Sequence, residues 1–93
     1  MLTRDAFVTL VQDRALTRMG IALDVSGGGV IEGRAFGRPV TGDWEWRDRY
    51  FCRTLYFGQR DLGANCQTVE VRGDTLRFTL DQGRGDFADL TLR

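Results

Sequence analysis

With 93 residues, of which 42% are hydrophobic and 11% aromatic, the chain can form one hydrophobic core and is too apolar to be disordered. Its 13 basic residues, all arginine, balance 13 acidic ones, so we expect neither nucleic-acid binding nor attachment to anionic membranes. The absence of histidine excludes histidine-based catalytic triads, general bases and metal ligands.

The first predicted element is a short helix over residues 3–13. Four apolar side chains share one face at helical spacing: Ala6, Phe7, Leu10 and Val11. Thr3 can cap the helix, and Asp5 suits the positive end of the helix dipole. We therefore expect this helix to pack its apolar face against the rest of the chain.

Residues 14–93 alternate between apolar and polar side chains in short runs that turn residues separate. This pattern predicts a mainly β fold, an antiparallel meander of about seven or eight strands. The expected strands are residues 14–18, 21–25, 30–36, 40–47, 50–57, 63–72, 75–81 and 86–92. A sheet with one apolar face and a single helix must curl, so residues 1–93 are expected to form one lipocalin-like barrel domain that the helix caps.

Short turns predict the register of these strands. The turn at 48–49 sets Trp46 opposite Phe51, and the last hairpin is expected to place Phe78 opposite Leu90. Each predicted hairpin buries the same face, whereas a slip by one residue would turn a buried set of side chains outward.

The two cysteines are predicted to be neighbours across the fifth and sixth strands. With 57–61 as the loop, Cys52 and Cys66 lie opposite each other on the outer face, where Cβ atoms are about 4.5–5.5 Å apart. A modest adjustment allows a disulfide, which is typical of periplasmic or secreted proteins. Two reduced thiols are the alternative, and a redox-active pair is not expected because the chain lacks C-x-x-C spacing.

The same register brings polar side chains onto the inner face, where Arg53, Asn65 and Gln67 lie beside Trp44 and Trp46. An arginine among aromatic rings costs free energy unless its donors are satisfied. One interpretation puts Arg53 at the barrel rim, stacked on Trp44 and bound to backbone carbonyls or water. The other interpretation makes these five residues the binding site of a small anionic or amide ligand.

Three classes of function remain. The favoured hypothesis is a noncatalytic module that binds a small ligand, and the alternative is a periplasmic protein-interaction or hydrolase-inhibitor domain that acts through its loops. An enzyme is not expected, because the chain has no histidine and no nucleophile beside a base. We predict no catalytic residue, no cofactor and no metal, since two cysteines cannot supply the four ligands of a structural zinc site. The oligomeric state stays open.

No apolar run approaches the roughly 18 residues of a membrane-spanning helix, so no membrane span is predicted. Residues 1–5 lack a signal-peptide pattern. We therefore expect a periplasmic or secreted protein if a leader has been removed, and a cytoplasmic one otherwise.

Four segments carry the most distinctive patterns: VTGDWEW at 40–46, YFCR at 50–53, NCQ at 65–67 and RFTLDQGRGD at 77–86. They resemble a family of small alphaproteobacterial proteins, with the pattern VTGxWxW…YFCR…NCQ, for which no activity is established. Family members with a signal peptide imply export and a disulfide. Some carry the label dihydrodipicolinate reductase, which the present residues do not support because no GxGxxG motif occurs on a βαβ unit.

Overall fold

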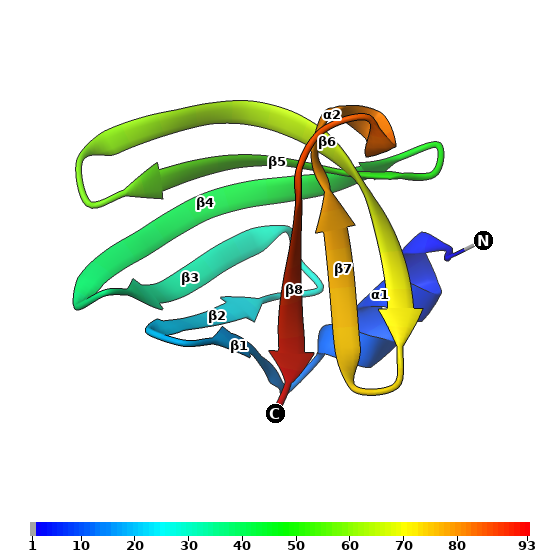
Figure 1. Ribbon diagram of the computed structural model, residues 1–93, viewed down its shortest axis with the longest axis horizontal. Helices are drawn as coiled ribbons and strands as arrows, with labels where there is room; N and C mark the ends of the chain where they lie inside the picture. Colours follow the sequence, from blue (N-terminus) through cyan, green and yellow to red (C-terminus); the bar gives the residue numbers. More distant parts are fainter. Residues whose placement is uncertain (1) are drawn as a thin grey trace.

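The strands of the computed structural model, which describes residues 2–93, follow one another in chain order around a closed barrel (Figure 1). Each strand pairs antiparallel with the next, and the first pairs with the last. The elements are α1 (Arg4–Val11), β1 (Ala15–Arg18), β2 (Ile21–Val25), β3 (Val30–Ala35), β4 (Arg38–Arg47), β5 (Tyr50–Phe57), β6 (Arg60–Arg72), β7 (Thr75–Thr79), α2 (Leu80–Gly83) and β8 (Phe87–Leu92). The predicted antiparallel barrel is confirmed.

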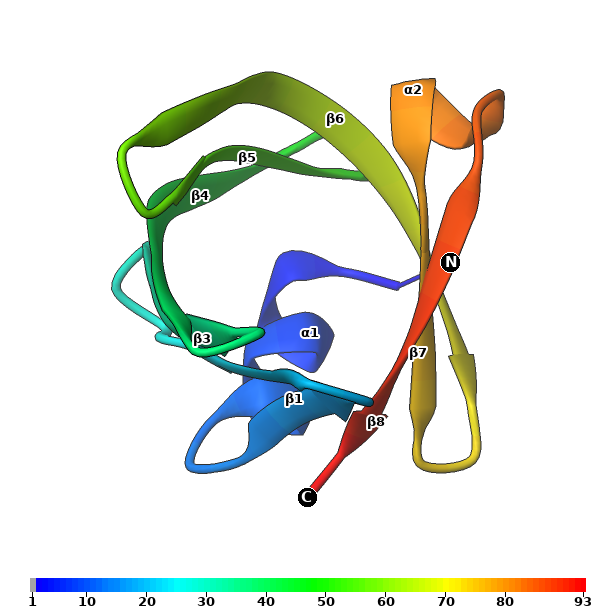
Figure 2. The same ribbon diagram turned by 60° about the vertical axis from the view of Figure 1, so that its left-hand side comes forward.

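Helix α1 begins where the sequence predicts its cap. The Thr3 hydroxyl accepts a hydrogen bond from the backbone N–H of Ala6 at 3.2 Å. The helix ends at Val11 and not at residue 13, because Gln12 has extended backbone angles and Asp13 has a φ of 60°. In Figure 2 the barrel is seen partly along its axis, with α1 lying across its opening.

Phe7 attaches α1 to the barrel. Its side chain is 0% exposed, and its ring centroid lies between 5.1 and 6.3 Å from those of four barrel rings. These rings belong to Trp44, Trp46, Phe51 and Phe78. Aromatic pairs at such distances stabilise a core by about 0.5–1.5 kcal/mol beyond the burial of their surface. The end of the barrel next to α1 is therefore filled by aromatic side chains.

The predicted register of the central strands is confirmed. Trp46 lies opposite Phe51 across the turn at 48–49, and Val25 lies opposite Ile31. Short turns and the alternating pattern suffice to determine the register of these strands, because any slip by one residue would expose a buried set of side chains.

The predicted pairing of the last hairpin is wrong by two residues. Phe78 lies opposite Ala88, not opposite Leu90, and β7 ends at residue 79 because the chain turns into the short helix α2. The backbone N–H of Leu80 donates to the Asp86 carbonyl at 2.8 Å, which closes the loop. The shift preserves the predicted inner face, because strand side chains alternate with a period of two.

The β5–β6 hairpin is also longer than predicted. Strand β6 begins at residue 60 and not at 63, and a β-bulge between Leu55 and Tyr56 absorbs the difference in register. The other predicted ends lie within two residues of the observed ones.

Two glycines mark places where neighbouring strands approach too closely for a side chain. A Cβ at Gly42 would collide with the Thr54 carbonyl oxygen, and a Cβ at Gly33 would collide with that of Ala22. Glycine at such positions lets the strands of a small barrel bend sharply.

We expect Gly42→Ala to lower the free energy of unfolding by about 1–3 kcal/mol, because strand β5 must move to admit the methyl group. Urea unfolding followed by tryptophan fluorescence measures this change. The matched control is Gly28→Ala, whose Cβ would lie 3.8 Å from its nearest neighbour, Ser26 Oγ. Equal unfolding midpoints for the two variants would contradict the steric argument.

Candidate functional site

The barrel interior holds a cavity of about 220 Å³ on the far side of Phe51 and Phe78 from the α1 helix. These two rings contact Phe7 on one side and line the cavity on the other. Most of its wall consists of apolar side chains from β1, β2, β3, β5 and β8, including Leu16, Leu23, Val25, Ile31, Leu55 and Leu90. Asp86 and Phe87, which are exposed, also line it and mark the side on which it opens.

Gln67 places an amide in this apolar cavity. The residue is 5% exposed, and no side-chain hydrogen bond within residues 2–93 involves it. Every fully enclosed side-chain nitrogen or oxygen in the same residues has a hydrogen-bond partner. The polar atoms of Gln67 therefore border the cavity, where a ligand or a water molecule can reach them.

Arg53 brings a positive charge to the same wall. Its Nη1 atom donates to the Gly63 carbonyl at 3.0 Å, and the four ion pairs found within residues 2–93 do not include it. Burial lowers the pKa of the Arg53 guanidinium below its ordinary value. An arginine nevertheless stays charged at neutral pH, so the cavity contains a half-buried cation.

Of the five residues predicted to bind a ligand, Arg53 and Gln67 line this cavity and the other three do not. Trp44 and Trp46 pack against the helix at the filled end of the barrel. Arg4, and not Arg53, stacks on Trp44, with its guanidinium carbon 5.6 Å from the ring centroid. Trp44, Arg53 and Asn65 also line a second, more open pocket, which includes neither Trp46 nor Gln67. The five predicted residues therefore do not share one site.

Asn65 holds the loop at the mouth of the cavity. Its Nδ2 atom donates to Asp81 Oδ1 at 2.8 Å, and its Oδ1 atom accepts from the Asp81 backbone N–H at 3.1 Å. Asp81 and Gln82 both have positive φ angles, of 54° and 59°. The two hydrogen bonds stabilise this unusual backbone, which carries Leu80 into the cavity wall.

The apolar wall is the part of the site that the sequence prediction omits. The inward positions of β1, β2 and β8 could be read from the alternating pattern, but their side chains look like ordinary core residues. Leu16, Leu23 and Leu90 line a cavity because the helix fills the other end of the barrel and leaves the space in front of these side chains open.

The predicted disulfide between Cys52 and Cys66 is confirmed. It joins β5 and β6 on the outer face, and each cysteine directly precedes a cavity residue, Arg53 or Gln67. The covalent bond therefore holds together the part of the wall that carries both polar groups.

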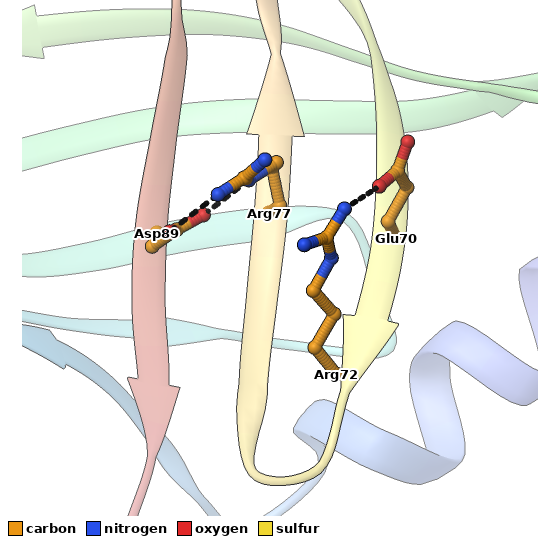
Figure 3. Close-up of polar contacts among 4 residues, drawn as sticks. All are labelled: Glu70, Arg72, Arg77 and Asp89. Carbon is orange, nitrogen blue, oxygen red and sulfur yellow. Dashed lines mark hydrogen bonds and ion pairs between the residues drawn. The ribbon is translucent and has the colours of Figure 1, made fainter.

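A second polar cluster lies on the outer face of β6, β7 and β8 and is internally satisfied (Figure 3). Arg77 points toward Asp89 and donates two hydrogen bonds to its carboxylate, at 2.8 and 3.1 Å, while Arg72 binds Glu70 at 3.1 Å. The Arg77 guanidinium also lies over the Phe87 ring, 3.8 Å from its centroid. Because these groups satisfy one another, we assign the cluster to stability and not to binding.

We expect removal of the disulfide in the double variant Cys52→Ala, Cys66→Ala to lower the free energy of unfolding by about 2–4 kcal/mol, the usual contribution of such a bond. Urea unfolding measures the difference. As a control, dithiothreitol should destabilise the natural chain and leave the double variant unchanged. Two titratable thiols in protein from an oxidising compartment would refute the assignment.

The Arg77–Asp89 pair predicts a specific pH dependence of stability. The hydrogen bonds from Arg77, followed by its charge, hold the pKa of Asp89 below its ordinary value of about 3.8. The folded state therefore gains stability above the ordinary pKa and loses it as the pH falls through the folded-state pKa. We expect Asp89→Asn and Arg77→Met each to flatten the decline in urea midpoint between about pH 5 and pH 2. A decline as steep as that of the natural chain would contradict this.

Within residues 2–93, no helix is long and apolar enough to cross a membrane, and no group of three or more acidic or cysteine side chains could hold a metal ion. Comparisons with models of protein families, with curated proteins and with solved structures found no match. The cavity and its two polar groups are therefore the features of the molecule that indicate a function.

Proposed function

We propose that the protein is a noncatalytic binding module that holds a small, mainly apolar ligand in the open half of its barrel. The observation that carries this proposal is the Gln67 side chain, which lines an apolar cavity and makes no side-chain hydrogen bond found within residues 2–93. Ligand sites typically combine apolar walls with a few polar groups that orient the ligand. An amide that borders an apolar cavity without a protein partner is free to orient a ligand by hydrogen bonding.

The volume of the cavity limits the size of the ligand. A cavity of 150 Å³ is large enough to bind benzene, so about 220 Å³ accommodates about nine non-hydrogen atoms. A longer molecule would extend past Asp86 and Phe87 into solvent.

The groups that line the cavity favour binding over catalysis. Its charged and amide side chains are Arg53, Gln67 and Asp86, and none of the residues lining it is a serine, threonine, cysteine or lysine that could act as a nucleophile. Both cysteines are bonded to each other on the outer face. The disulfide further supports a periplasmic or secreted location, because such bonds persist in oxidising compartments.

Filling the cavity should prevent binding. Ala88 lines the cavity opposite Phe78, so Ala88→Phe would place a ring in the space that a ligand needs. We expect native mass spectrometry of protein purified gently from its own host to show a stoichiometric adduct on the natural chain and none on this variant. The matched control, Ala22→Phe, adds the same ring at an exposed position on β2 and should keep the adduct. An adduct of equal mass on the Ala88 variant would place the ligand outside the cavity.

One observation favours the alternative, a protein-interaction or inhibitor domain. Met19 and Phe36 are 92% and 71% exposed, and their turns touch, since the Phe36 N–H donates to the Gly20 carbonyl at 2.7 Å. Figure 1 shows these turns at the end of the barrel away from α1. Exposed apolar side chains that cluster in this way often contact a partner. Phe36→Ser should abolish the binding of a partner at this surface, and Ala88→Phe should leave it unchanged. A ligand in the cavity predicts the reverse.

A further inference from the structure

We infer that the ligand is an amphiphile with a single negatively charged headgroup, such as a medium-chain monocarboxylate, and that Arg53 binds this headgroup. This inference rests on the proposed binding function and adds the chemical class of the ligand. Three features of the cavity lead to it: the unused donors of Arg53, its position beside Gln67, and the apolar character of the remaining wall.

Arg53 has more hydrogen-bond donors than the protein uses. A guanidinium carries five N–H groups, and the one side-chain hydrogen bond found for Arg53 within residues 2–93 goes to the Gly63 carbonyl. The ion pairs of the same residues all involve other arginines, namely Arg4, Arg47, Arg72 and Arg77. A half-buried cation without a counter-charge is unfavourable, so an anion that enters the cavity gains a ready partner.

The β5–β6 register places Arg53 and Gln67 close enough to bind one headgroup. Arg53 pairs with Asn65 and Phe51 pairs with Gln67, so Arg53 and Gln67 are diagonal neighbours on the inner face. Diagonal neighbours on two antiparallel strands lie about 7–8 Å apart across the pair, within reach of long side chains. A carboxylate between them can accept hydrogen bonds from the guanidinium and from the amide nitrogen.

The rest of the cavity selects against a second charge. The side chains that surround this polar pair are leucine, valine, isoleucine, phenylalanine and alanine, which favour an unbranched or cyclic hydrocarbon. The other charged group is Asp86 at the exposed side, and it would repel a second anionic group. With room for about nine non-hydrogen atoms, the cavity holds nearly all of an eight-carbon monocarboxylate, which has about ten.

The test compares octanoate with 1-octanol, two ligands of equal chain length that differ in charge. Both are titrated by calorimetry into the full-length chain with its disulfide intact, at pH 7. We expect octanoate to bind at least about tenfold more tightly, because hydrogen bonds to charged groups are stronger than those between neutral ones.

A matched pair of variants assigns the preference to Arg53. Arg53→Gln removes the charge and keeps an amide donor, so the affinity for octanoate should fall to that for octanol. Arg49→Gln removes the same charge from an exposed position in the turn between β4 and β5 and should keep the preference. Chemical-shift changes on binding should centre on cavity residues such as Ala88 and Leu90.

The possible outcomes test the anionic headgroup separately from the proposed binding function. Equal binding of octanoate and octanol would overturn the anionic headgroup and leave the apolar binding site standing. Binding of neither ligand would overturn both. If Arg53→Gln does not fold, the comparison of the two ligands on the natural chain still decides the class of headgroup.

Discussion

Insertion of Phe7 into the aromatic cluster is the interaction on which the rest of the structure depends. A ring that is fully buried against β4, β5 and β7 fastens α1 across one end of the barrel. The interior of an eight-stranded barrel is just wide enough for side chains or one small ligand. Side chains of the helix fill one half of the barrel interior, and the cavity occupies the other half. The proposed binding function depends on this open half.

The polar wall of the cavity depends on one pair of strands. The disulfide on the outer face of β5 and β6 covalently holds the register that places Arg53 and Gln67 together on the inner face. A strand pair locked in this way keeps the backbone of two polar residues in a fixed arrangement, which reduces the conformational entropy that the protein loses when a ligand binds. Stability and the proposed binding site therefore share the same covalent bond.

The mouth of the cavity depends on a local contact that short-range patterns do not reveal. Asn65 binds both the backbone and the side chain of Asp81 and so stabilises a turn with successive positive φ angles. This turn replaces the strand that the alternating pattern predicts for 80 and 81, and it sets the pairing of β7 with β8. Asn65 thus fixes the loop at the mouth of the cavity without lining the cavity itself. The sequence pattern predicts it to be among the ligand-binding residues.

The sequence by itself determined the antiparallel meander, the register of its central hairpins, the capped helix and the pairing of Cys52 with Cys66, because each depends on short turns and on the alternation of side chains along neighbouring strands. Only the tertiary structure decided which inward residues line a cavity and which fill the core. Trp44 and Arg53 face inward from paired positions, yet the helix covers one and leaves the other in open space. Inward direction is a local property of a strand, whereas the space in front of a side chain depends on a helix that is distant in the chain.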